Sequence, residues 1–360
     1  MEPLKEMFNK QFYQHFASEF NKADKTFNAT AFVKEMLTGI EPLSLNERMR
    51  KTSLTLKKYL PPDYKKSIAI MRKVIPHTRG GYTNLVFPDF VGLYGHDDIT
   101  TSLEALKYFT TFGSSEFAIR EFLKRDFKTT IKVMQAWAKD KDPSVRRLAS
   151  EGSRPRLPWS FKLDEVIKNP KSTQSILETL RSDEELYVKK SVANHLNDLS
   201  KDNTEHMLQL VKSWDKTNAH TAWIIKHASR TLIKKGNANS LAIFDFEKDP
   251  KIKIQNFKIL APKIKLGQNL AFEFELASEK NKDQKLVVDY IIHYQKKGKE
   301  LSEKVFKLKE LVLKPKEKIQ ITKKQMIKDF TTRKHFAGEH FLEIQVNGKV
   351  LAKLKFNLSV

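Results

Sequence analysis

The residues best suited to chemistry lie in the stretch 142–159, which reads DPSVRRLASEGSRPRLPW. Asp142 is a favourable helix N-cap and a proline suits the first turn, so a helix begins here. We expect this helix to end at Gly152, with the usual C-terminal glycine. Glu151 then lies in the last turn, where the helix macrodipole disfavours an acid. Trp159 follows two prolines that a helix interior does not tolerate, so no packing period explains it.

Four arginines accompany this carboxylate, namely Arg146, Arg147, Arg154 and Arg156. Arginine binds phosphate oxygens through paired hydrogen bonds. An acid in an unfavourable place, with arginines around it and a loop tryptophan after it, indicates a site that meets a polyanion. The alternative is that Glu151 is a surface acid that pairs with Arg147 or Arg154.

The segment VRRLASEGSRPRLPW resembles the signature of the AlkC-type DNA alkylation-repair glycosylases, which are relatives of the AlkD enzymes. Similar segments are FVGLYGHDD (90–98), VANHLNDLSKDN (192–203) and WIIKHASRTLIKKG (223–236), so the resemblance covers most of residues 1–240. It implies a base excision repair enzyme that releases small cationic lesions, such as 3-methyladenine, from double-stranded DNA. It also implies that the base is not drawn into a deep pocket.

Such a reaction breaks an N-glycosidic bond. A purine methylated at N3 is already cationic, so its departure needs no further proton. What remains is to stabilise positive charge on the deoxyribose and to place a water, and carboxylates do both. Glu151 is our first choice for this role. The resemblance adds Glu116, although an acid in a first helical turn is also simply stabilising, and Asp198, which could equally be a helix-end acid. Trp159 is the expected aromatic wall.

A repeat appears in the second part of the helical region. Val145, Val188 and Ile225 recur at intervals of roughly 40 residues, which with paired helices is typical of HEAT-type repeats. Lys189 and Lys190 then fall where the paired arginines fall on the previous helix. These basic pairs predict a stripe of phosphate-binding side chains on a concave surface, and the alternative is a solvated basic face.

The pattern changes near Asp249, where apolar residues begin to alternate with polar ones, as in LAFEFEL (270–276). Several short strands over the last hundred or so residues predict a β-sandwich. Some AlkC-type proteins carry an immunoglobulin-like C-terminal domain, and this segment resembles one. We therefore predict an all-α HEAT-like repeat domain that binds DNA and catalyses, residues 1–247, followed by an all-β immunoglobulin-like sandwich, residues 248–360.

One hairpin of this domain has a predictable register. Asn347-Gly348 signals a turn. A two-residue loop would place the apolar residues of the two strands on opposite faces. A three-residue loop that includes Lys349 pairs Ile344 with Ala352 and aligns both apolar faces, so we expect the three-residue form.

Charge and composition narrow the class of binding partner that we expect. The formal net charge is +23, which points to nucleic acid or an anionic surface, or reflects only a lysine-rich composition. Residues 248–360 hold 26 lysines and arginines against 13 acids, a net charge of +13. Only Arg333 among these cations is an arginine. Lysine contacts phosphate as a point charge, so we expect this domain to clamp the DNA backbone without reading sequence. The alternative is a basic appendage that never touches DNA.

Several classes of site are not expected. There is no cysteine, which excludes disulfides and thiolate metal sites. His195, His220 and His227 lack a metal-ligand spacing with neighbouring acids, so we predict no metal and no cofactor, and we interpret these histidines as structural or as contacts to the DNA backbone. The N-terminus has no apolar signal core and no run of residues could span a membrane. We expect a cytoplasmic monomer.

Three functions compete on this evidence. The first is a monofunctional DNA glycosylase, since no lysine lies in the signature stretch to form a Schiff base. The second is a non-catalytic HEAT scaffold for nucleic acid or an acidic protein. The third is a peripheral membrane adaptor, which the sequence favours least because it lacks a basic amphipathic helix with exposed aromatic residues. Only the enzyme requires Glu151 and Trp159.

Overall fold

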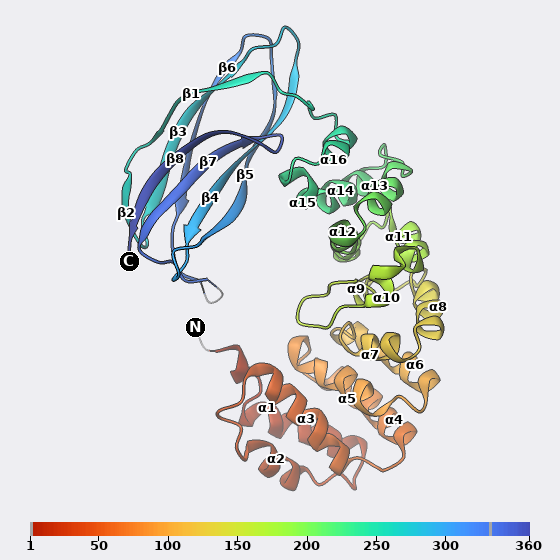
Figure 1. Ribbon diagram of the computed structural model, residues 1–360. Helices are drawn as coiled ribbons and strands as arrows, with labels where there is room; N and C mark the ends of the chain where they lie inside the picture. Colours follow the sequence, from red (N-terminus) through yellow and green to blue (C-terminus); the bar gives the residue numbers. More distant parts are fainter. Residues whose placement is uncertain (1–2, 331–332) are drawn as a thin grey trace. The chain divides into compact units, whose positions relative to one another are not determined.

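The computed structural model describes residues 3–330 and 333–360 (Figure 1). The chain forms two compact units that divide between Ala228 and Ser229. The first is helical and the second consists mainly of strands. The domain boundary predicted at 247/248 stays a prediction, since α15 (Arg230–Lys234) and α16 (Ala238–Ile243) belong to the second unit and the first strand begins at Ile252.

The first unit is a succession of helices joined by turns and loops, with a long loop between residues 152 and 164 (Figure 1). Its α-helices are α1 (Lys10–Ala23), α2 (Ala29–Leu37), α3 (Leu45–Tyr59), α4 (Tyr64–Val74), α5 (Val86–Tyr94), α6 (Ile99–Phe109), α7 (Ala118–Arg125), α8 (Phe127–Trp137), α9 (Pro143–Gly152), α10 (Asp164–Lys168), α11 (Gln174–Leu180), α12 (Leu186–Asp202), α13 (Thr204–Lys212) and α14 (Ala219–Ala228).

Local sequence signals set where several helices begin. The side chains of Asn9, Asp63, Asp98, Asp126 and Asp142 each accept a hydrogen bond from a backbone N–H in the first turn of the helix that follows. This satisfies donors that the helix itself leaves unpaired. The predicted start of α9 at Asp142 is therefore confirmed.

The repeat predicted from the sequence corresponds to helices that pack side by side. The long helix α12 packs against α9 on one side and α14 on the other. Val188, Val192 and Leu196 lie along α12 at four-residue intervals and are fully buried. One apolar stripe per helix thus builds a continuous core through successive repeats.

Gly152 closes α9 for a different reason from the one predicted. It is the last residue of the helix, but its backbone is not in the left-handed region that a glycine cap adopts. A Cβ at this position would lie 2.4 Å from Cγ2 of Ile119 on α7. Glycine is needed here because α7 and α9 approach each other closely.

The second unit contains two sheets. Its strands are β1 (Ile252–Ile259), β2 (Lys263–Lys265), β3 (Asn269–Ser278), β4 (Gln284–Gln295), β5 (Leu301–Leu313), β6 (Lys318–Met326), β7 (Gly338–Val346) and β8 (Lys349–Ser359). One sheet has the order β1-β3-β6 and the other β2-β8-β7-β4-β5. All neighbours are antiparallel except β2 and β8, which pair parallel.

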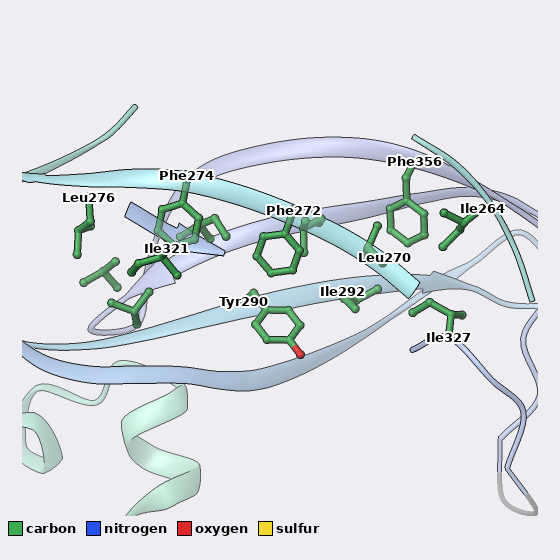
Figure 2. Packing of buried hydrophobic residues seen from close by; sticks show 14 of the residues in the cluster. Ile264, Leu270, Phe272, Phe274, Leu276, Tyr290, Ile292, Ile321, Ile327 and Phe356 are labelled. Atoms are coloured by element: carbon green, nitrogen blue, oxygen red, sulfur yellow. The ribbon is translucent and has the colours of Figure 1, made fainter. Parts of the chain in front are cut away.

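The core of this unit lies between the two sheets (Figure 2). Leu270, Phe272 and Phe274 of β3 face Tyr290 and Ile292 of β4, and the rings of Phe272 and Tyr290 lie 5.3 Å apart. These are the alternating apolar positions that the sequence assigns to one face. The predicted fold class, HEAT-like helices followed by an immunoglobulin-like sandwich, is confirmed.

The β7–β8 hairpin has the predicted pairing but not the predicted loop. Ile344 pairs with Ala352, as expected. The loop, however, contains only Asn347 and Gly348, both with positive φ, as a type I′ turn requires. The extra residue is accommodated by a bulge next to Ile344, because β8 has one more residue than β7 between the turn and this pair.

We predict that Gly152→Ala destabilises the helical unit by about 1–3 kcal/mol, because its methyl group would overlap Ile119. Chemical denaturation followed by helical circular dichroism measures this change. Gly92→Ala is the matched control, since Gly92 also lies in a helix and a Cβ there makes only ordinary contacts, the nearest at 3.4 Å. Equal stability of the two variants would contradict our explanation of Gly152.

Candidate active site

The carboxylate of Glu151 is buried at the end of α9. The residue is 6 % exposed, and its Oε1 lies 2.6 Å from Nη1 of Arg154 and 3.5 Å from Nη2 of Arg147. Two guanidinium groups therefore compensate an acid that the helix macrodipole disfavours. The alternative interpretation of Glu151 as a surface acid was right about its partners but wrong about its exposure.

Arg154 connects this carboxylate to the next repeat. Its Nε and Nη2 lie 2.8 and 2.7 Å from Oδ2 of Asp198 on α12, and Lys201 contacts the other oxygen of Asp198 at 2.9 Å. Asp198 is only 2 % exposed. Burial lowers the pKa of Arg154, but Glu151 and Asp198 outweigh this effect, so the pKa is raised above its usual value. The guanidinium is thus a permanent cation between two acids.

Glu116 lies on the other side of Arg147. It precedes α7 in a turn, rather than lying within the first helical turn as predicted. Its carboxylate forms an ion pair with Nη1 of Arg147 and accepts a hydrogen bond from the Ser114 hydroxyl at 3.0 Å. Acids and arginines therefore alternate in one chain of contacts from Glu116 through Arg147, Glu151 and Arg154 to Asp198.

Trp159 lies on the surface, as its flanking prolines predicted. It is 84 % exposed and has a φ of 64°, an uncommon conformation for a large side chain. The residue borders a recess of about 410 Å³ whose lining also includes Glu116, Glu151, Arg154 and Tyr82. The structure thus brings two of the three predicted carboxylates, Glu116 and Glu151, and the predicted aromatic wall to one recess. Asp198 does not line this recess and reaches it only through Arg154.

A second, larger recess adjoins the first and also reaches Trp159. Its volume is about 1010 Å³, and Tyr82 and Phe117 line both recesses. Neither residue was singled out from the sequence.

The sequence analysis also missed Arg120, the residue beneath the recess. This arginine is fully buried on α7 and donates hydrogen bonds to the backbone carbonyls of Gly152, Arg154 and Phe161. Burial, and then the charge of Arg154, lower the pKa of Arg120 to about 10. It fixes the loop that carries Trp159. An arginine within an apolar helix stripe was the only signal in the sequence.

The remaining predicted cations lie outside the recess. Arg146 forms a two-bond ion pair with Asp183, with Nε 2.6 Å from Oδ2, and Arg156 forms a similar pair with Asp202. Lys189 contacts His220 Nδ1 at 2.9 Å. Lys190 is exposed on the same helix. Their role in binding phosphate stays a prediction.

Tyr187, at the start of α12, is a further residue that the sequence did not indicate. The guanidinium carbon of Arg147 lies 4.7 Å from the centre of its ring. Burial raises the pKa of its phenol. About half of the residue nevertheless remains exposed, so the ring closes the outer side of the Arg147 contact.

His195 has a structural role. It is fully buried on α12, and its two ring nitrogens contact the carbonyl of Ser150 at 3.0 Å and the hydroxyl of Thr173 at 3.3 Å. It therefore connects α12 to α9 behind the recess, where it cannot reach DNA. Trp137 and Trp214 are likewise buried.

The described residues contain no group of three or more His, Cys, Asp or Glu side chains that could hold a metal ion. None of the helices in that part of the chain is both long and apolar enough to cross a membrane.

The fold defines a HEAT-like helical protein that carries an immunoglobulin-like domain. Residues 103–232 match the family described as DNA alkylation repair enzyme, and residues 253–360 match the C-terminal immunoglobulin-like domain of the uncharacterised protein YhaZ. The chain is 38 % identical to YhaZ of Bacillus subtilis (strain 168) over 99 % of its own length and 100 % of that protein.

A solved structure extends this likeness over the whole chain. The alkylpurine DNA glycosylase AlkC of Pseudomonas fluorescens, bound to DNA that contains an abasic site analogue, is 45 % identical, with 100 % of both chains covered and a TM-score of 0.96. The chain belongs to the AlkC-type family.

His195 predicts a measurable pH effect on stability. Burial lowers its pKa to about 3 in the folded state, against an ordinary value of 6.5. As the pH falls below about 6.5, only the unfolded chain takes up this proton, so stability present at neutral pH is lost. We expect wild type to lose about 2 kcal/mol relative to His195→Gln between pH 7.5 and pH 5. Urea unfolding of both proteins across this pH range, followed by helical circular dichroism, tests this prediction. A difference in the free energy of unfolding that stays constant with pH would refute it.

Proposed function

We propose that this protein is a monofunctional DNA glycosylase that hydrolyses the N-glycosidic bond of cationic N-alkylated bases, such as 3-methyladenine, in base excision repair. The observation that carries the proposal is the recess that joins Glu151, Glu116 and Trp159. The membership of the chain in the AlkC-type family supports it, because AlkC of Pseudomonas fluorescens is an alkylpurine DNA glycosylase that binds DNA.

The proposed reaction requires negatively charged groups near the deoxyribose rather than a proton donor to the leaving base. A cationic base leaves as a neutral molecule when the glycosidic electron pair moves onto it, and positive charge then develops on the deoxyribose. Glu151 and Glu116 stabilise this charge, and Glu151 also takes a proton from the attacking water. Arg154 fixes the Glu151 carboxylate in advance, so little reorganisation of this group is required as the charge develops.

Asp198 is the third carboxylate of the proposed site, and it acts through Arg154 rather than on the substrate. It holds Arg154 through two short contacts, and Arg154 in turn holds Glu151. Asp198 therefore acts as a positioning residue, whose loss would leave a buried guanidinium without one of its two acids.

The proposed substrate meets the protein on an open surface. Trp159 is mostly exposed, so its ring can lie against the cationic nucleotide without a sealed base pocket. Lys189, Lys190 and the exposed edges of Arg146 and Arg156 are the proposed contacts to the phosphates. These contacts carry no sequence information, which suits an enzyme that must find a lesion anywhere.

The decisive experiment is the incubation of full-length protein with methylated DNA and with uracil-containing DNA, followed by chromatography of the released bases. We expect 3-methyladenine to be released and uracil to remain, because the described residues that line the recess include no histidine or cysteine to protonate a neutral leaving base. Release of uracil would refute the mechanism. DNA binding without release of any base would favour the non-catalytic scaffold.

We predict that Glu151→Gln lowers the single-turnover rate of base release by about 100-fold or more while DNA binding persists, since it removes a charge that acts in the transition state. Glu104→Gln is the control, because Glu104 is an exposed acid on α6. A folded Glu151→Gln protein with an unchanged rate would remove Glu151 from the proposed mechanism.

The second unit is proposed to bind the DNA backbone through its lysines. A shortened chain should end at Ala228 rather than near Asp249, because Leu241 and Phe246 form a small core with Val287 of β4. We expect removal of residues 229–360 to flatten the dependence of log affinity on log salt by about 0.9 for each lost phosphate contact. Equal slopes for the two proteins would favour a domain that never touches DNA.

A further inference from the structure

Two arginines face Glu151, and they are held unequally. Arg154 is 8 % exposed in its side chain and is bound by two contacts to the buried Asp198. Arg147 is 13 % exposed, and it approaches Glu151 only to 3.5 Å. Besides Glu116 and Glu151, Arg147 contacts the Ser114 hydroxyl through a 3.0 Å hydrogen bond and the face of the Tyr187 ring, and it contacts no further carboxylate among the described residues. Arg154 is therefore the more deeply buried of the two guanidinium groups and lies closer to Glu151, whereas Arg147 is more exposed and lies farther from Glu151.

The position of Arg147 matters because it lies between two carboxylates. Nη1 pairs with Glu116 and Nη2 faces Glu151. A substrate cation that approaches these two acids meets a guanidinium already there. Two positive charges that are this close repel each other, and they do so more strongly in a partly buried site than in bulk water. The guanidinium and the substrate charge therefore compete for the same two partners.

Tyr187 provides a second favourable contact for the guanidinium group of Arg147. Its ring lies 4.7 Å from the guanidinium carbon on the exposed side of the contact. A cation that leaves the carboxylates along this ring keeps a favourable cation–π contact as it moves towards solvent, where the DNA phosphates would be. The cost of displacing Arg147 is lowered accordingly.

We infer that Arg147 is a resident cation of this site, which occupies the position between Glu116 and Glu151 until the positive charge of the nucleotide replaces it. This inference rests on the proposed function. A neutral nucleotide offers nothing in exchange for the guanidinium, whereas a cationic nucleotide does. Arg147 is therefore a specificity-determining residue that couples entry to the carboxylates to the charge of the substrate.

The test compares two DNA duplexes that differ only in charge at one nucleotide. One carries a neutral tetrahydrofuran abasic analogue and the other a protonated pyrrolidine analogue. Full-length protein is titrated with each at pH 7.5 and fixed salt, and the ratio of the neutral to the cationic Kd is taken. The ratio cancels any loss of a phosphate contact, which affects both duplexes equally.

We expect Arg147→Met to raise this ratio about tenfold over wild type, because the vacated acids attract the cation without competition. Arg146→Met is the control, since Arg146 pairs with Asp183 and contacts neither Glu116 nor Glu151, and it should leave the ratio unchanged. An unchanged or lower ratio in folded Arg147→Met would mean that Arg147 only positions the carboxylates, which overturns the inference.

Tyr187→Leu provides a second variant, because Tyr187 is exposed and its replacement leaves the ion pairs in place. Without the contact to the Tyr187 ring, the guanidinium group of Arg147 is held less firmly, so the ratio of the neutral to the cationic Kd should rise about threefold. If Arg147→Met does not fold, an unchanged ratio in Tyr187→Leu decides against the inference. Release of 3-methyladenine by the wild-type protein, measured in parallel, separates the role of Arg147 from the proposed function. If the base is released but the Kd ratios of the variants do not rise, only the role of Arg147 is refuted. If no base is released, the proposed function is refuted.

Discussion

The site depends on one buried interaction, the link from Glu151 through Arg154 to Asp198. A buried charge is stable only when it is paired and hydrogen-bonded, and here one guanidinium satisfies an acid from α9 and an acid from α12 at once. The link therefore fixes the distance between two repeats as well as the direction of the Glu151 carboxylate. The removal of any one of the three would leave at least one buried charge with one partner fewer inside the helical unit.

Similar pairs of an arginine with an acid later in the chain recur along the repeats. Arg146, Arg154 and Arg156 each pair with an acid that follows 37, 44 and 46 residues later in the chain, which is about one repeat. Arg120 adds contacts to uncharged groups, because it donates hydrogen bonds to the carbonyl of Gly152 at the end of α9 and to the carbonyls of Arg154 and Phe161 in the loop that follows. The loop is therefore rigid enough to present Trp159, a large aromatic residue, to solvent. A stack of repeats held together by charge thus also builds a charged site at its surface.

The sequence by itself determined those features that depend on neighbours in the chain. Asp142 caps its helix because the capping bond spans only two residues, and the prolines alone keep Trp159 out of a helix. Alternation along the strands assigned one face to the core, and this rule placed Ile344 opposite Ala352 in the hairpin. The helix-end position of Glu151 marked it as unusual for the same local reason, since the macrodipole acts within a single turn.

The tertiary structure alone decided which charges meet. Nothing local distinguishes an arginine that binds phosphate from one that binds a distant acid, so the pairing of Arg147 with Glu116 and of Arg154 with Asp198 could not be read from their spacing. Arg120 lies in an apolar stripe, and only the packing of α7 shows that backbone carbonyls surround it. Tyr187 likewise reaches the site from the following repeat. Long-range electrostatics depends on distances through space, and a sequence records distances along the chain.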